Sequence, residues 1–287
     1  MATGRSPGLA QFEGIEDIAI VAAPGASVGM SGAAWQDSAD AVAASLLHHC
    51  KKMRYRVAGI DCCIVQSVSE VRALRSKLDS AHGALYYPWV KVAGADGKDL
   101  LLPPSGFVAG IYARNDVERG VQKSPASEMI RSATGFEVNI TNAQQDELNP
   151  EGVNCLRSFD RRGHRVWGAR TLSTAPDWQY VHVRRHLCYL ERSIDKGTQW
   201  AAFEPNLEAK WAKVRQSIED FLYGEWHHAA MPGDKPGAPF FVRCDRSTMM
   251  QDDLDNGRLV CLVGVAPLKP AEFIVFRIGQ WTAHRKV

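Results

Sequence analysis

Histidine and cysteine neighbours are the side chains of this sequence that could hold a metal ion. His48, His49 and Cys50 are consecutive, and His227 and His228 form a second group. Neighbouring residues on a helix point in different directions, and neither group has the C-x-x-C or H-E-x-x-H spacing of a zinc site. We therefore interpret these histidines as residues of helix faces or helix ends, and we predict no metal site.

Nucleophilic and nucleotide chemistry have equally little support. Cys62 and Cys63 end a predicted strand, but no sequence feature near them would lower a thiol pKa, so we expect buried structural thiols. The sequence contains neither G-x-G-x-x-G after its first predicted strand nor G-x-x-x-x-G-K-[ST], and Gly94–Asp99 has the spacing of a hairpin turn. We predict no catalytic residues and no cofactor.

Charged clusters could instead contact other macromolecules. One basic stretch contains Phe159 and Trp167, a mixture used to bind nucleic acid, but 34 basic against 32 acidic side chains leave a net charge of only +2. We therefore favour contacts with protein. The D-D-L-D-N-G run lacks the spacing of a calcium loop, so we interpret it as a capped turn or a charged contact. The candidates for charged contacts are Arg161, Arg162, Arg165, Asp252, Asp253 and Asp255.

The elements that must position these side chains alternate between strand and helix in the first half of the chain. The predicted segments are strands at 15–23, 55–65 and 84–92, a helix that Asp37 or Ser38 can cap, and a helix at 69–78. This alternation predicts a doubly wound α/β core with parallel strands. No apolar run approaches the ~20 residues that span a bilayer, so we expect no direct membrane insertion.

The second half has short strands and loops up to residue 172, followed by two strongly periodic helices and a mixed C-terminal sheet. The first helix has Val183, Leu187, Leu190 and Ile194 on one stripe and ends near Gly197. The second helix follows Pro205, with Asn206 as its cap. The predicted strands of the sheet are 240–244, 258–266 and 272–280. We expect both helices to pack on the sheet. We divide the chain into an α/β part, 1–135, and a C-terminal region, 136–287, with one continuous domain as the alternative.

The last predicted strand, 272–280, is almost continuously apolar. Its apolar residues are Phe273, Ile274, Val275, Phe276 and Ile278, which alternate between two faces. Such a strand can pair within its own chain or be lent to the sheet of another subunit, and the pattern favours neither.

A run of conformationally restricted residues precedes another predicted helix. Pro103 and Pro104 fix an extended approach, Ser105 can accept a hydrogen bond from early helix amides, and Gly106 permits close packing against a neighbouring backbone. We predict that these four residues form a docking motif.

Several segments, taken in order, resemble the phage tail sheath family, which includes sheath proteins of bacteriocin-type tails and extracellular contractile injection systems. The resemblance is densest in 102–127, LPPSGFVAGIYARNDVERGVQKSPAS. Further matching segments are LNPEGVNC, RVWGART, VHVRR, GTQWAAFEPN, QDDLDNGRL and APLKPAEFIVFRI. Together they extend over nearly the whole chain.

The resemblance implies a structural subunit that assembles helically around an inner tube and contracts to drive it through a target envelope. The implied partners are further copies and sheath paralogues, an inner tube protein, and baseplate and tail-terminator proteins, without nucleic acid. Assembly would take place in the bacterial cytoplasm, and the product would be a phage tail or a released injection particle. In this family, arms from both chain ends add strands to adjacent subunits, and here the C-terminal candidate is 272–280.

One departure from the family affects this expectation. Members usually carry an N-terminal arm before the strand that corresponds to 15–23, and we expect that arm to be absent here. The alternative interpretation is therefore a non-polymerising or accessory sheath-like α/β protein, a truncated paralogue without catalysis.

Overall fold

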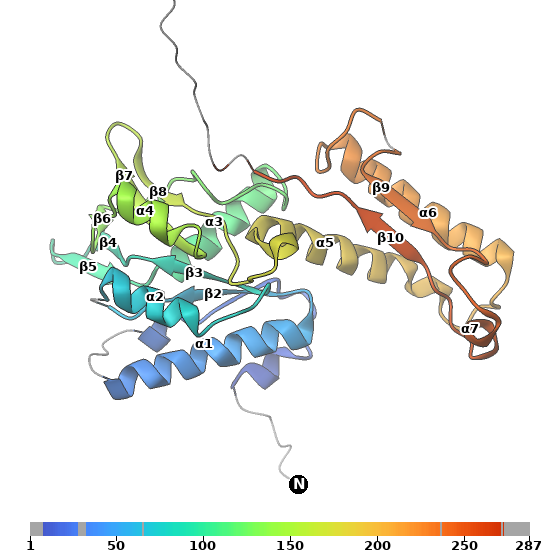
Figure 1. Cartoon of the computed structure of the whole chain (residues 1–287), viewed down its shortest axis with the longest axis horizontal. Coiled ribbons are helices and arrows are strands. Elements are labelled where there is room, and N and C mark those ends of the chain that lie inside the picture. The colour runs from blue at the N-terminus through green and yellow to red at the C-terminus, as the bar shows by residue number, and fades with distance from the viewer. Residues whose placement is uncertain (1–7, 28–32, 65, 236, 271, 273–287) are drawn as a thin grey trace, which may run out of the picture.

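The computed structural model describes residues 8–27, 33–64, 66–235, 237–270 and 272. In these residues an α/β body is joined by a long helix, α5, to a smaller C-terminal unit, and the segment after the last strand returns to the body (Figure 1). Short 3-10 helices occupy Gly8–Phe12, Pro24–Ser27, Pro176–Trp178 and Gln199–Ala201. No helix of the described part is both long and apolar enough to cross a bilayer.

The body is built on a five-stranded sheet in the order β1-β2-β3-β7-β8. Its strands are β1 (Ile20–Ala22), β2 (Val57–Asp61), β3 (Gly83–Tyr87), β7 (Val153–Phe159) and β8 (Gly163–Trp167). The first four are parallel, and β8 returns antiparallel to β7. Because β7 and β8 lie beyond residue 135, the segments 1–135 and 136–287 share this sheet.

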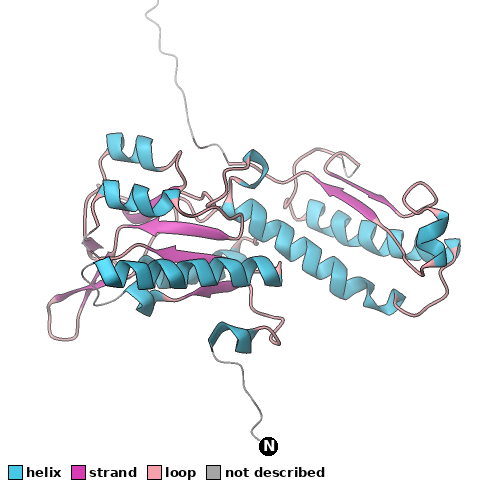
Figure 2. Cartoon of the chain, turned by 60° about the horizontal axis from the view of Figure 1, so that its bottom comes forward, coloured by secondary structure: helices cyan, strands magenta, loops and turns pink. Residues whose placement is uncertain are grey.

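Helices cover both faces of the sheet (Figures 1 and 2). They are α1 (Ala33–Met53), α2 (Val68–Ser76) and α4 (Asn142–Leu148), which pack into one core, and α3 (Pro104–Glu118), which packs into the other. Within β3, Leu85 and Tyr87 face the first core, whereas Ala84 and Tyr86 face the second. A strand buried on both faces must be apolar throughout, which is typical of parallel sheets. The predicted doubly wound core is confirmed.

Several predicted strands are shorter than expected; the run 55–65, for example, forms a strand only over β2. The run 84–92 is divided at Pro88, which has no N–H to donate to a sheet, and continues as β4 (Val90–Ala93) in a second sheet with β5 (Asp99–Leu102) and β6 (Gly135–Phe136). The expected hairpin turn between β4 and β5 is confirmed, since the Gly94 N–H donates to the Lys98 carbonyl at 2.8 Å.

The first strand begins only at Ile20 rather than at residue 15. The carbonyl oxygens of Phe12 and Ile15 accept hydrogen bonds from the Arg56 guanidinium, and the Asp17 carboxylate pairs with a lysine of α5. Within the run, the Ile15 carbonyl is thus bonded to a side chain rather than to a neighbouring strand. A helical cap at Asp37 or Ser38 was also wrong, because α1 already begins at Ala33.

The C-terminal unit consists of α5 (Val181–Thr198), α6 (Glu208–His227), β9 (Phe240–Arg243), α7 (Gln251–Asp255) and β10 (Leu262–Val265). Its core contains the expected stripe residues Leu187, Leu190 and Ile194 of α5, together with α6 and the antiparallel β9–β10 ribbon. The expected cap of α6 is wrong. Asn206 precedes the capping position, and its side-chain oxygen accepts from the Trp211 indole at 2.7 Å instead.

Candidate functional site

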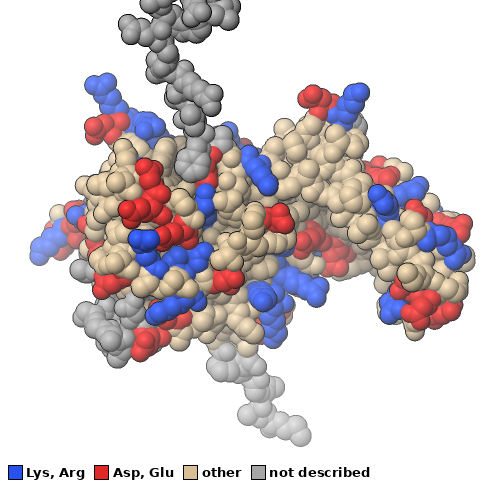
Figure 3. All heavy atoms as spheres, viewed as in Figure 1, with Lys and Arg blue, Asp and Glu red and all other residues tan. Residues whose placement is uncertain are grey.

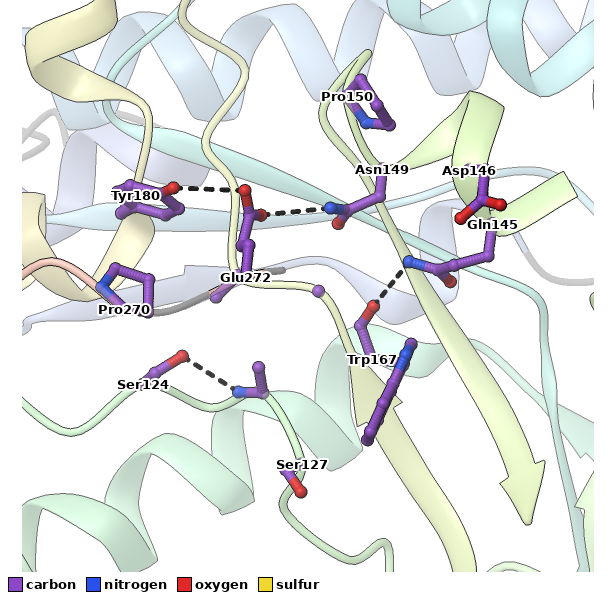
Figure 4. Close-up of a pocket in the computed structure, with 13 residues that line it drawn as sticks. Ser124, Ser127, Gln145, Asp146, Asn149, Pro150, Trp167, Tyr180, Pro270 and Glu272 are labelled. Atoms are coloured by element: carbon purple, nitrogen blue, oxygen red, sulfur yellow. Dashed lines mark hydrogen bonds between the residues drawn. The ribbon is translucent and has the colours of Figure 1, made fainter. Parts of the chain in front are cut away.

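Glu272, the last described residue, is held by three side chains of the α/β body. Its carboxylate accepts hydrogen bonds from Arg170 at 2.9 and 2.6 Å, from the Asn149 amide at 3.1 Å and from the Tyr180 hydroxyl at 3.1 Å. Asn149 caps the end of α4, Arg170 follows β8 and Tyr180 precedes α5, so residues near three elements converge on one carboxylate. Figure 4 shows Asn149 and Tyr180 bonded to Glu272. We call Glu272, Arg170, Asn149 and Tyr180 the C-terminal clamp.

The clamp is an ion pair sheltered from water. The side chains of Arg170 and Glu272 are only 11% and 15% exposed. Burial works against the ionised carboxylate, but the hydrogen bonds from Arg170, Asn149 and Tyr180 outweigh it and lower the pKa of Glu272. The carboxylate therefore stays charged at neutral pH and holds Glu272 on the body.

A cavity of about 350 Å³ lies beside the clamp, lined in part by Gln145, Asn149, Trp167, Tyr180 and Glu272 (Figure 4). The Gln145 amide nitrogen donates to the Trp167 carbonyl at 3.0 Å. The amide oxygens of Gln145 and Asn149 accept no hydrogen bond from the described residues. The described wall of the cavity carries hydroxyls, amides and carboxylates, among them Ser124, Ser127 and Asp146.

Sequence reasoning missed the clamp. Arg170 appeared only within the segment RVWGART, and Glu272 only as the first residue of an apolar strand. The available signal was a single carboxylate at the head of an otherwise apolar run.

Most of the predicted docking motif is buried in the folded protein. Pro103, Pro104 and Ser105 are buried, and only Gly106 is exposed. The expectation that Ser105 accepts from early amides of α3 is wrong. Its N–H and hydroxyl both donate to the Asp61 carboxylate, at 2.7 and 2.5 Å, so Asp61 at the end of β2 holds the first turn of α3 on the sheet.

This contact gives a pH-dependent prediction. Burial raises the pKa of Asp61 from 3.8 to about 6, although both hydrogen bonds from Ser105 oppose the shift. Between these values the folded chain keeps a proton that the unfolded chain has lost. Stability due to Asp61 should therefore fall as pH rises from about 4 to about 6, by on the order of 3 kcal/mol.

The measurement is urea unfolding of the chain and of its Asp61→Asn variant at both ends of this range. The amide keeps an acceptor for the Ser105 N–H but cannot ionise. We expect the variant to gain stability relative to the parent chain at the higher pH. Asp177→Asn, at an exposed site, is the control, and an Asp61→Asn difference that does not change with pH would refute the account.

The basic candidates lie at the β7–β8 turn. Arg161 and Arg162 are exposed, and the Arg162 guanidinium lies 4.4 Å from the centre of the Phe159 ring. Arg165 instead makes an intramolecular hydrogen bond, since its guanidinium donates to the carbonyl of Ser127 at 2.5 Å. Figure 3 shows positive and negative side chains interspersed over this face of the molecule, rather than one broad basic surface.

The acidic candidates lie on α7, where the expected capped turn is confirmed. The Asp253 carboxylate accepts from the N–H of Met250 at 3.1 Å, and Arg258 pairs with Asp253 at 2.9 Å and with Asp252 at 2.6 Å. Asp255 accepts from its helix neighbour Gln251. Figure 1 places α7 and the β7–β8 turn at opposite ends of the molecule, so these two clusters do not meet within one chain.

The apolar residues of the predicted last strand lie outside the described part of the chain; they are Phe273, Ile274, Val275, Phe276 and Ile278. Cys62 and Cys63 are buried, as expected, and burial raises the pKa of both thiols.

His48 and His49 lie on α1, and His227 ends α6, which confirms their interpretation as helix residues. In the described ranges no group of three or more His, Cys, Asp or Glu side chains is arranged to hold a metal ion.

Family comparison covers almost the whole chain. Residues 7–172 match the model of the phage tail sheath protein central domain, and 173–280 match that of the phage tail sheath C-terminal domain. A putative prophage major tail sheath protein of Pseudomonas aeruginosa is 26% identical over 188 residues, which are 62% of this chain and 47% of that protein. The tail sheath protein of Enterobacteria phage T4 is 23% identical over 177 residues, which are 60% of this chain and 26% of that protein. The chain thus spans less than half the length of these curated relatives.

Two solved structures resemble the fold closely. The helical sheath of the anti-feeding prophage in its contracted state is 36% identical, with a TM-score of 0.78 over 94% of this chain and 72% of that chain. The sheath complex of the extracellular contractile injection system PVC, also contracted, is 34% identical, with a TM-score of 0.72 over 79% of this chain and 65% of that chain.

Proposed function

The chain belongs to the phage tail sheath family, and on that premise we propose that it is a structural subunit that assembles helically around an inner tube and contracts to drive that tube through a target envelope. The likeness of nearly the entire chain to the contracted helical sheath of the anti-feeding prophage carries this proposal. The proposed partners are further copies and paralogues, the inner tube protein, and baseplate and terminator proteins. The role is mechanical and needs no catalysis.

The β9–β10 ribbon is the proposed receiver of strands from adjacent subunits. Among the described residues, each of its strands pairs only with the other, so two rows of backbone donors and acceptors are open. Phe241 and Leu262 are large apolar side chains of the ribbon that are 46% and 50% exposed. A two-stranded ribbon is marginal by itself, and added strands would complete both its hydrogen bonds and its apolar surface.

The C-terminal clamp is the proposed origin of the lent strand. The segment 266–272 returns from β10 to the body, where Glu272 is fixed (Figure 1). In this proposal, the apolar residues of 273–280 would be lent from this point on the body. Strand addition there would give a link whose hydrogen bonds survive while Pro267–Pro270 flexes and the compact parts rotate during contraction.

The charged candidates support the same proposal. Because Arg161 and Arg162 lie far from Asp252 and Asp255 within one chain, opposite charges could meet only between different copies. Such contacts would mainly determine how adjacent subunits align, and they would contribute less to how tightly the subunits bind each other.

A pair of variants tests the linking strand. Ile274→Asp combined with Phe276→Asp places two charges on one face of the predicted strand, and we expect it to abolish tubes in negative-stain electron microscopy while the chain alone still folds. Thr282→Asp, just beyond the predicted strand, is the control and should still give tubes. Normal tubes from the double variant would rule out strand lending by 272–280.

A further inference from the structure

Cys244 and Cys261 lie opposite each other at one end of the β9–β10 ribbon. The paired register runs from Phe240 with Val265 to Arg243 with Leu262, so the next residues on the two strands are these two cysteines. Both thiols pack against the side chains around Trp211, and they are hydrogen-bonded to each other. Both are free thiols in this structure.

Their place in the hydrogen-bond pattern suits a covalent bond. The Ala266 N–H donates to the Pro239 carbonyl, which marks that pair as a hydrogen-bonded one. Because such pairs alternate along an antiparallel ribbon, Cys244 and Cys261 occupy a non-hydrogen-bonded position, where Cα atoms are about 4.5 Å apart. Disulfides form between Cα atoms separated by roughly 4.4 to 6.8 Å. The two sulfurs can therefore join without a movement of the backbone.

We propose that Cys244 and Cys261 form an intramolecular disulfide when the protein meets an oxidising small-molecule disulfide. With oxidised glutathione, the thiolate of the partly buried Cys261 attacks one glutathione sulfur and releases one glutathione thiolate. The thiolate of Cys244 then attacks the Cys261 sulfur of this mixed disulfide and releases the second glutathione. Two protein thiols are oxidised and one glutathione disulfide is reduced to two glutathione molecules, whose released thiolates take up, through solvent, the two protons that the cysteines lose.

The environment of the thiols sets the rate of this reaction. Burial is the main cause that raises the pKa of Cys261 to about 12, and burial also raises the pKa of Cys244. Since only the thiolate attacks, oxidation should be slow at neutral pH and become faster as pH rises.

The bond would close the segment 245–260, which contains α7, into a covalent loop. Closing a loop removes conformational freedom mainly from the unfolded chain, so the folded ribbon should become more stable. This inference goes beyond the proposed assembly function and holds whether or not the chain polymerises.

The test is oxidation of the purified full-length chain with glutathione disulfide at mildly alkaline pH. We expect an intact mass lower by two hydrogen atoms, a non-reduced peptide joining Cys244 to Cys261, and a thermal midpoint raised by several degrees and restored by dithiothreitol. Cys261→Ser should lose all three changes, whereas Cys63→Ser should keep them. Stable addition of glutathione to Cys261, with Cys244 still free, or no change in mass at all, would overturn the proposal.

Discussion

Replacing Asp116 with Ala is expected to lower the free energy of unfolding by about 3 kcal/mol, because it leaves a buried guanidinium without its carboxylate. Arg185 donates to both oxygens of Asp116, at 3.0 and 2.5 Å, and its side chain is only 4% exposed. The same guanidinium lies 4.4 Å from the centre of the Tyr112 ring.

The pair also joins two parts of the fold. Asp116 lies on α3 of the α/β body, and Arg185 lies on α5, which leads to the C-terminal unit. Urea unfolding measures the cost, and Glu118→Ala, at an exposed site on the same helix, is the control, which should change stability by no more than about 0.5 kcal/mol. Equal effects of the two substitutions would show that the ion pair does not hold α5 on the body.

Replacing Glu272 with Ala is expected to cost about 2 kcal/mol of stability and to prevent tube formation. It removes every bond of the clamp and leaves the sheltered Arg170 side chain without its carboxylate. Hydrogen exchange of residues 266–272 should become faster as this segment loosens. Asp146→Ala removes an exposed carboxylate from the same cavity and is the matched control.

The clamp also predicts a dependence on pH. Since the pKa of Glu272 is lowered by folding, its stabilisation is present above the ordinary range of a glutamate and is lost as pH falls through the folded pKa. The stability difference between the parent chain and Glu272→Gln should therefore shrink in acid. A Glu272→Ala chain that forms tubes as well as Asp146→Ala would contradict the proposed role of the clamp.

Most helices and buried strands were predictable from sequence because their signals are local. Buried parallel strands are apolar throughout, and apolar residues recur every three to four positions on the buried face of a helix. The apolar stripe through Leu187, Leu190 and Ile194 predicted α5 correctly. These patterns depend only on which side of an element faces a core, so they can be recognised without knowing which other element packs there.

The clamp and the role of Ser105 could not be predicted in this way. Arg170 and Glu272 are 102 residues apart in the sequence, and Asp61 and Ser105 are 44 apart. Ser105 has the residue type of a helix cap, but a distant carboxylate competes for its donors once the chain folds. Asn206 likewise gives its side chain to Trp211 rather than to the helix amides. Local propensity does not identify such tertiary partners.

The most direct measurement is negative-stain electron microscopy of this chain, produced together with a candidate inner tube protein and any longer sheath paralogue from the same source. The account predicts helical tubes that contain this chain and enclose the inner tube. Monomers alone, in the presence of both partners, would contradict it and would favour an accessory sheath-like protein that does not polymerise.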